Sequence, residues 1–107
     1  MKKRRVLILS MLLALGTASA QAQQPRPADL DVRGLAANCA ACHGTDGRAA
    51  AGSTVPGLAG LSREQFTAQM RAFKSGARPA TVMTQLAKGF SDAQIDQLAG
   101  YFAGLKR

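Results

Sequence analysis

The chain has 107 residues, of which 14 are Lys or Arg and six are Asp or Glu, which gives a formal net charge of +8. Because it contains only four Phe, one Tyr and no Trp, we expect a single small domain with a modest core. The positive charge is not evidence for nucleic-acid binding. Four of the basic residues lie at positions 2–5, and the interleaved basic and aromatic residues of nucleic-acid binders are absent. We therefore exclude nucleic acid as a partner.

The N-terminus has the three regions of a secretory signal peptide. Basic residues precede the apolar run 6–15, and small residues follow up to Ala20 and Ala22, either of which satisfies the small-x-small rule for cleavage. The apolar run is too short to span a membrane, so a retained anchor is the less favoured alternative. We expect residues 1–22 to be a signal peptide and the mature protein to be periplasmic, without a transmembrane span. Ten basic and six acidic residues then remain, a net charge of +4.

Residues 23–29 are predicted to be a flexible leader, because this part of the chain is rich in Gln and Pro. The folded domain is expected over residues 30–107. Its first helix should begin near Asp29 or Asp31, either of which can cap it. Gly34 lies inside this helix at a cost of ~1 kcal/mol in helix propensity, which predicts a close helix crossing at that point.

The helix leads into Cys39-Ala40-Ala41-Cys42-His43, which contains both cysteines and the only histidine of the chain. The spacing C-x-x-C-H is typical of covalent haem attachment, in which two thiols form thioethers and the histidine binds the iron. A structural zinc site needs four ligands, and the chain has three Cys and His residues in total. A thioredoxin-like dithiol lacks its strand-helix context, and a plain disulfide does not explain the adjacent histidine.

Residues 44–60 are rich in Gly and lack periodicity, so they are predicted to form a loop. The informative part of this loop is Pro56, because its carbonyl can accept the proton on the second nitrogen of His43 and fix the orientation of the ring. An ordinary surface turn at Pro56 and Gly57 is the alternative interpretation.

Two later helices carry the same start signal. Ser62 with Gln65 and Ser91 with Gln94 form capping boxes, which predict helices from these points to about Ser75 and to about Ala103. Gly76 is the predicted stop of the first of them. A short helix is expected over residues 81–88. Tyr101, on the last helix, is predicted to pack at Gly34. No segment alternates with a period of two, so the fold class is all-α.

The sixth ligand of a haem iron decides what such a protein does. Because His43 is the only histidine, methionine is the leading candidate for this ligand, and within the mature chain the choice lies between Met70 and Met83. Met70 shares a helix face with Phe66 and Phe73, which is the pattern of a core residue. Met83 follows an irregular stretch that can wrap over a haem, so Met83 is the favoured ligand.

In this order, these features resemble those of the small bacterial class I cytochromes c. The runs that carry the resemblance are CAACHG at 39–44, Pro56-x-Leu58, FKSG at 73–76, the turn at Met83 and AGYF at 99–102. The C-terminal half is most similar to the monohaem cytochrome subunit of flavocytochrome c sulfide dehydrogenase, through FKSG, TVM at 81–83, AKGFS at 87–91 and AGYF. The resemblance covers residues 30–104. Members of that group can carry two haem domains, whereas this chain has room for one.

The resemblance implies an all-α, class I cytochrome c fold of about four helices around one covalently bound haem c. It implies that Cys39 and Cys42 hold the haem and that His43 and Met83 are its axial ligands. The carbonyl of Pro56 is expected to support His43, and Arg78 is expected to meet a haem propionate. An exposed basic side chain without such a contact is the alternative for Arg78.

With both axial positions filled, the iron has no vacancy for a substrate, so the implied function is one-electron transfer rather than catalysis. The expected donor is a dehydrogenase, with a sulfide-oxidising flavoprotein as one candidate. Four basic residues form either a rim that guides an acidic partner or a solvated face: Arg71, Lys74, Arg78 and Lys88. The alternative function is a haem protein with an open or labile sixth site that binds a gas or reduces peroxide. The chain offers no second histidine and no obvious acid and base pair for peroxide cleavage.

Overall fold

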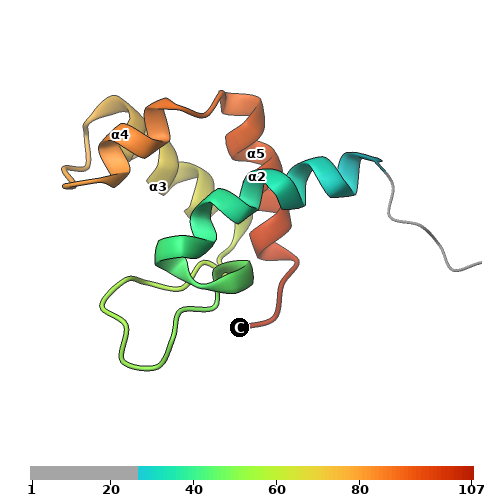
Figure 1. The fold of residues 1–107 in the computed structure, drawn as a ribbon. Helices are drawn as coiled ribbons and strands as arrows, with labels where there is room; N and C mark the ends of the chain where they lie inside the picture. Colours follow the sequence, from blue (N-terminus) through green and yellow to red (C-terminus); the bar gives the residue numbers. More distant parts are fainter. Residues whose placement is uncertain (1–26) are drawn as a thin grey trace, which may run out of the picture.

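The computed structural model of the chain describes residues 27–107, so the predicted signal peptide lies outside the described residues. The elements are the helices α2 (Pro27–His43), α3 (Arg63–Ser75), α4 (Met83–Lys88) and α5 (Asp92–Ala103) and the short 3-10 turn η1 (Thr45–Gly47) (Figure 1). The described part of the chain contains no strand, which confirms the all-α prediction. No helix within it is long and apolar enough to cross a membrane.

The first helix begins earlier than the sequence predicted. It starts at Pro27, so Asp29 and Asp31 lie inside α2 instead of capping it. Proline is favoured in the first turn of a helix, because its ring fixes a helical φ and the N–H that it lacks has no partner there. The expected flexible leader over 23–29 is therefore wrong for residues 27–29, and residues 23–26 lie outside the described residues.

Both capping boxes are present as predicted. At α3, the Ser62 hydroxyl accepts from the Gln65 N–H at 3.1 Å, and the Gln65 side chain accepts from the Ser62 N–H at 3.3 Å. Ser91 and Gln94 repeat this exchange at α5, at 3.1 and 2.9 Å. These pairs satisfy N–H groups that otherwise have no partner at a helix start, which explains why the sequence located both helices correctly.

The end of α3 and the start of α4 test the remaining boundary predictions. Gly76 follows α3 with a φ of 81°, the left-handed conformation that ends many helices, as predicted. Helix α4 begins at Met83, two residues later than predicted, and Val82 before it makes no side-chain cap. The start of α4 is therefore held by weaker local interactions than the starts of α3 and α5.

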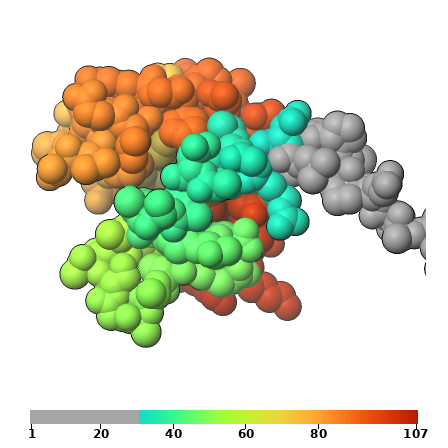
Figure 2. All heavy atoms as spheres, viewed as in Figure 1, coloured from blue at the N-terminus to red at the C-terminus, as the bar shows by residue number. Residues whose placement is uncertain are grey.

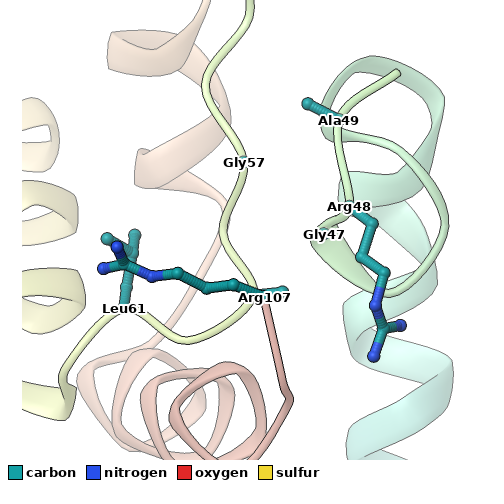
Figure 3. A pocket seen from close by; sticks show the side chains of 7 residues that line it. Gly47, Arg48, Ala49, Gly57, Leu61 and Arg107 are labelled. Carbon is teal, nitrogen blue, oxygen red and sulfur yellow. The ribbon is translucent and has the colours of Figure 1, made fainter. Parts of the chain in front are cut away.

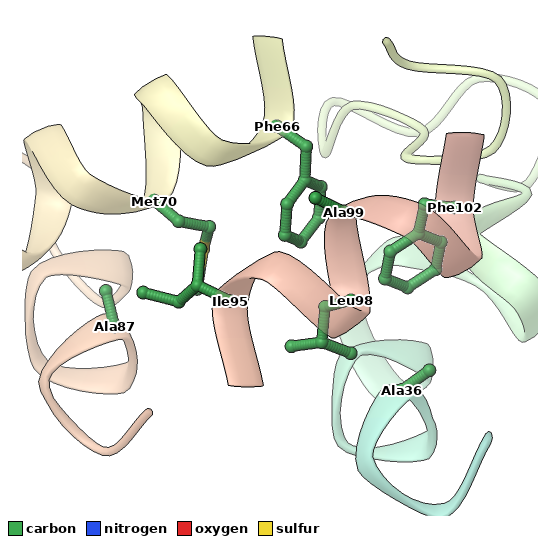
Figure 4. Close-up of a cluster of buried hydrophobic side chains, with 8 residues drawn as sticks. All are labelled: Ala36, Phe66, Met70, Ala87, Ile95, Leu98, Ala99 and Phe102. Atoms are coloured by element: carbon green, nitrogen blue, oxygen red, sulfur yellow. The ribbon is translucent and has the colours of Figure 1, made fainter. Parts of the chain in front are cut away.

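Helix α5 supplies more of the core than any other element, as the side chains in Figure 4 show. Ile95, Leu98, Ala99 and Phe102 on one face of α5 are all completely buried. The ring of Phe102 stacks on Phe66 of α3 with the centroids 5.4 Å apart. Helices α2 and α3 both pack on α5, while α4 packs on α3, so α5 is the support against which the other elements are positioned.

The predicted packing of Tyr101 on Gly34 is wrong. A Cβ at Gly34 would have no neighbour within 4 Å among the described residues, so no close helix crossing occurs there. Tyr101 instead lies beside the small residues Ala36, Ala37 and Ala40 further along α2, and its hydroxyl donates to Asp46 at 2.7 Å. This hydrogen bond joins residues 55 positions apart, a long-range contact that helix periodicity does not reveal.

Candidate haem-binding site

The attachment motif lies in the last two turns of α2. Cys39 and Cys42 are three residues apart, and side chains at this spacing are neighbours on one helix face. Cys39 is half-buried, Cys42 is exposed, and neither forms a disulfide. Burial raises the pKa of the Cys39 thiol, which favours its neutral form. The end of α2 thus presents two free thiols close to the imidazole of His43.

His43, the last residue of α2, has its ring orientation fixed by the loop. Its Nδ1 lies 2.6 Å from the carbonyl oxygen of Pro56, so the hydrogen bond predicted from the sequence is present. A carbonyl oxygen only accepts, so Nδ1 carries the proton and donates it. Nε2 is then left with the free lone pair that a metal ligand requires. The turn at Pro56 therefore has a specific partner and is more than a surface connection.

Gly47 is the residue that brings Pro56 back to His43. The Gly47 carbonyl accepts from the N–H groups of Leu58 at 2.7 Å and Ala59 at 3.1 Å. Gly47 has a φ of 71°, and a Cβ there would lie 2.8 Å from Leu58 Cβ and 2.9 Å from a ring carbon of Phe102. Only glycine fits this conformation and this space without rearrangement. The loop over 48–57 is thereby closed at its base, two residues after Pro56.

Asp46 connects the same turn to α5. Its carboxylate accepts from the Tyr101 hydroxyl at 2.7 Å and lies 3.5 Å from the Arg48 guanidinium. Burial, followed by the hydrogen bond to Asp46, raises the pKa of Tyr101. Turn η1, which begins two residues after His43, is therefore fixed both to the 56–59 segment by Gly47 and to α5 by Asp46.

The two candidate methionines have different surroundings. Met70 is 6% exposed and belongs to the core cluster between α3 and α5, where Figure 4 shows it beside Ile95. Met83 is the first residue of α4 and is only half-buried at the edge of that cluster. Its thioether is therefore not committed to the core, as that of Met70 is. Figure 2 shows α4, the end of α2 and the loop after it on one face of the molecule.

The residues of this face fit a covalently bound haem. Two thiols at the required spacing and an imidazole with a free Nε2 are its attachment and ligand groups. Val82 and Leu86, the two large hydrophobic residues that are markedly exposed in the described part of the chain, flank Met83 at 54% and 48% exposure. These two side chains leave apolar surface on α4 and on the residue before it that is available for contact with a haem. No group of three or more Cys, His, Asp or Glu residues in residues 27–107 is arranged to hold a metal ion by itself.

The predicted basic residues are largely engaged within the chain. Arg71 pairs with Asp96 at 3.5 Å, and Lys74 pairs with Asp92 at 2.9 Å. Arg78 has its guanidinium 4.7 Å above the centroid of the Phe73 ring and hydrogen-bonds Gln69.

Of the four predicted rim residues, Lys88 is the one without such a contact in the described residues, which favours a solvated face over a dedicated rim. The contact of Arg78 with a haem propionate stays a prediction.

A separate cavity of about 460 Å³ lies between residues 47–49, the 57–61 segment and Arg107 (Figure 3). Its lining contains none of the predicted haem residues. The two arginines at its edge extend in different directions in Figure 3, and each has another partner, Asp46 for Arg48 and the Gly60 carbonyl for Arg107. The cavity is thus not part of the candidate site.

Sequence reasoning missed Asp46, Gly47 and the role of Lys74. The sequence Thr-Asp-Gly at 45–47 carries a turn signal, and this signal alone could have located η1. Nothing in the sequence pairs Asp46 with Tyr101, which lies 55 positions later. The sequence leaves Lys74 either in a rim or on a solvated face, because its ion-pair partner Asp92 is 18 positions away.

The sequence and its relatives identify the family. The family described as cytochrome c matches residues 32–106. The chain is 39% identical over 103 residues to a thiosulfate dehydrogenase electron acceptor of Thiomonas intermedia, covering 96% of this chain and 45% of the relative. It is 40% identical over 73 residues to the cytochrome subunit of sulfide dehydrogenase of Chlorobaculum tepidum, covering 68% of this chain and 64% of the relative.

A further relative matches over most of its own length. The chain is 40% identical over 78 residues to cytochrome c-553 of Helicobacter pylori, covering 71% of this chain and 79% of the relative. By contrast, the chain spans less than two thirds of the length of the two dehydrogenase-associated relatives. Similarity alone therefore does not assign the activities of those longer proteins to this chain.

Proposed function

Because the chain belongs to the cytochrome c family and is therefore an electron-transfer protein that carries covalent haem c, we propose that His43 and Met83 are its axial ligands. Cys39 and Cys42 are the proposed points of thioether attachment. When bound, the haem supplies a single electron-accepting and electron-donating centre.

The observation that carries the proposal is the hydrogen bond from His43 Nδ1 to the Pro56 carbonyl. It leaves Nε2 as the only ring nitrogen able to bind iron, and it raises the basicity of that nitrogen. Gly47 closes the base of the loop, and Asp46 fixes the turn to α5. The proximal ligand is therefore preorganised by three elements of the fold rather than by its own rotamer preference.

The second ligand is assigned to Met83 because Met70 is occupied by core packing. Met70 is 6% exposed, so moving its thioether to a haem would leave a cavity between α3 and α5. Met83 is only partly buried, at the edge of the core cluster, so moving its thioether to a haem disturbs the core less. Val82 and Leu86 next to it provide apolar surface that keeps water away from the ligand bond. A filled sixth position supports electron transfer without catalysis at the iron.

We assign the electron donor to the dehydrogenases of reduced sulfur compounds. The support is the similarity to a thiosulfate dehydrogenase electron acceptor and to the cytochrome subunit of sulfide dehydrogenase, with a flavoprotein as a candidate donor. We also propose that the chain is exported and acts in the periplasm, because residues 1–22 have the pattern of a signal peptide.

Carbon monoxide binding tests this function. The reduced mature protein is mixed with carbon monoxide, and its absorption spectrum is compared with that of the Met83→Ala variant. We expect the native protein to bind carbon monoxide at least about 100-fold more weakly than the variant, because the gas must displace the thioether. Equal, tight binding by both proteins would support an open sixth site and the gas-binding or peroxide-reducing alternative. Fractionation of the native host, with detection of the protein in the cytoplasm, would contradict the assigned location.

A further inference from the structure

Helix α4 needs an external anchor to hold Met83 in place. It has only six residues, and its start at Val82 has no side-chain cap. Helices this short are not stable alone in water. Ala87 is the one fully buried residue of α4, and with the partly buried Met83 it docks the helix against α3 and the core cluster. The position of Met83, the first residue of α4, therefore depends on contacts made elsewhere along the helix.

Lys74 makes such a contact at the other end of α4. Its ammonium donates to the Phe90 carbonyl at 2.8 Å and to the Asp92 carboxylate at 2.9 Å. The Phe90 N–H in turn donates to Ala87 in the last turn of α4, at 3.3 Å. One side chain from α3 thus joins the turn between α4 and α5 to the first residue of α5. The bond from Lys74 to the Phe90 carbonyl is partly buried, whereas the Asp92 side chain is 66% exposed, so water competes less for the bond to Phe90 than for the ion pair.

Arg71, on the same helix, provides the natural comparison. It also pairs with an aspartate of α5, but at 3.5 Å to Asp96, and both side chains are about half exposed. Among the interactions of the described residues, it has none with α4 or with the turn that follows. Arg71 and Lys74 therefore both connect α3 to α5, whereas Lys74 alone also fixes the end of α4.

We propose that Lys74 is a positioning residue for the sixth ligand: by holding the Phe90 carbonyl against α3, it keeps α4 docked and Met83 on the iron. This inference rests on the proposed ligation by Met83. Loss of the Lys74 contacts leaves the iron chemistry unchanged and raises the fraction of molecules in which Met83 is displaced. An added ligand then binds more tightly in proportion to that fraction.

Imidazole binding to the ferric holoprotein tests the proposal. The variant Lys74→Met removes the ammonium and keeps the apolar stem, and Arg71→Met is the matched control. We expect Lys74→Met to bind imidazole about tenfold more tightly than the native protein, the effect of losing one charge-assisted hydrogen bond. Arg71→Met should stay within about twofold of the native protein. Amide hydrogen exchange should accelerate at residues 85–90 in Lys74→Met and not in Arg71→Met.

The possible outcomes distinguish a failure of ligation by Met83 from a failure of the proposed role of Lys74. If the native protein lacks the near-infrared band of a sulfur-to-iron bond, the ligation by Met83 fails and this proposal fails with it. If the band is present but Lys74→Met and Arg71→Met bind imidazole equally, the proposed function stands and the role of Lys74 is overturned. The role of Lys74 is also overturned if amide hydrogen exchange in α4 is unchanged in Lys74→Met, because the Lys74 contacts then do not hold the helix.

Discussion

Asp46 is the only residue other than glycine with a positive φ, 54°, among the described residues. Aspartate tolerates this left-handed conformation better than most residues do, at a small cost in backbone energy. Its carboxylate is thereby directed to Tyr101 and Arg48. The turn next to His43 therefore contains a small backbone strain at Asp46, which the contacts with Tyr101 and Arg48 offset.

The hydrogen bond of Tyr101 predicts a pH-dependent contribution to stability. We expect Tyr101→Phe to lower the free energy of unfolding by about 1–2 kcal/mol at neutral pH, because Asp46 loses its hydroxyl partner. Since the folded pKa of Tyr101 is raised, the native hydroxyl stabilises the protein fully below the unfolded pKa of about 10. This advantage is lost as the pH rises through the folded pKa. Urea unfolding of both proteins between neutral and alkaline pH measures it, and a difference that does not change with pH would contradict it.

The pair of Lys74 and Asp92 predicts the opposite pH dependence. The hydrogen bond and the positive charge of Lys74 lower the pKa of Asp92. A lowered folded pKa gives a stabilisation that is present above the unfolded pKa of about 3.9 and is lost as the pH falls through the folded value. We expect Asp92→Asn to have a lower urea midpoint than the native protein at pH ~7, and the difference to shrink as the pH falls below the unfolded pKa. The control is Asp31→Asn, because Asp31 forms no ion pair in the described residues; an equal loss in this control would point to net charge rather than to the pair.

At the scale of elements, local signals were sufficient for α3 and α5 and insufficient for the rest. A capping box involves residues three positions apart, so the sequence located both helix starts correctly. The hydrogen bond between His43 and the Pro56 carbonyl was also predictable, because only 13 positions of a single loop separate the two residues. The contact of Tyr101 with Asp46 was not, since it depends on how α2 and α5 pack. Capping signals do not predict the start of α2 at Pro27, because Asp29 and Asp31 are stronger N-cap residues than a proline.

The turn η1 predicts a difference between two glycines with similar backbone conformations. Gly47 and Gly52 have φ values of 71° and 78°, but only Gly47 has atoms where a Cβ would lie. We expect Gly52→Ala to cost about 1 kcal/mol from the backbone alone. Gly47→Ala should lower the free energy of unfolding by about 1–3 kcal/mol more than Gly52→Ala does, because its Cβ overlaps Leu58 and Phe102. Chemical unfolding of the two holoproteins measures both values, and equal losses would show that the contacts of Gly47 are unimportant.

At the scale of the whole molecule, the core is thin for a domain of this size. Of the nine buried hydrophobic residues in the described part of the chain, four are alanines: Ala36, Ala59, Ala87 and Ala99. Small domains usually need a covalent or cofactor staple in addition to their packing. Helices α2 and α4 do not pack on each other to any extent comparable with their contacts to α5 and α3. A haem joined to α2 through the cysteines and to α4 through Met83 would connect them.

Removal of the haem is therefore expected to remove cooperative folding. The variant Cys39→Ser with Cys42→Ser has no thiol for attachment, and we expect it to lose the sharp thermal unfolding transition of the holoprotein. Circular dichroism recorded during heating measures this change, with native protein that has passed through the same purification as the control. A haem-free variant that unfolds as sharply and at the same temperature as the holoprotein would show that the polypeptide core is sufficient.

The measurement that tests the central claim most directly is the absorption spectrum of the ferric protein in the near infrared. We compare the native protein with Met83→Ala and with Met70→Leu, which keeps the core filled. We expect the weak band of a sulfur-to-iron bond in the native protein and in Met70→Leu, and its loss in Met83→Ala. Absence of the band from the native protein, or its loss in Met70→Leu alone, would contradict ligation by His43 and Met83.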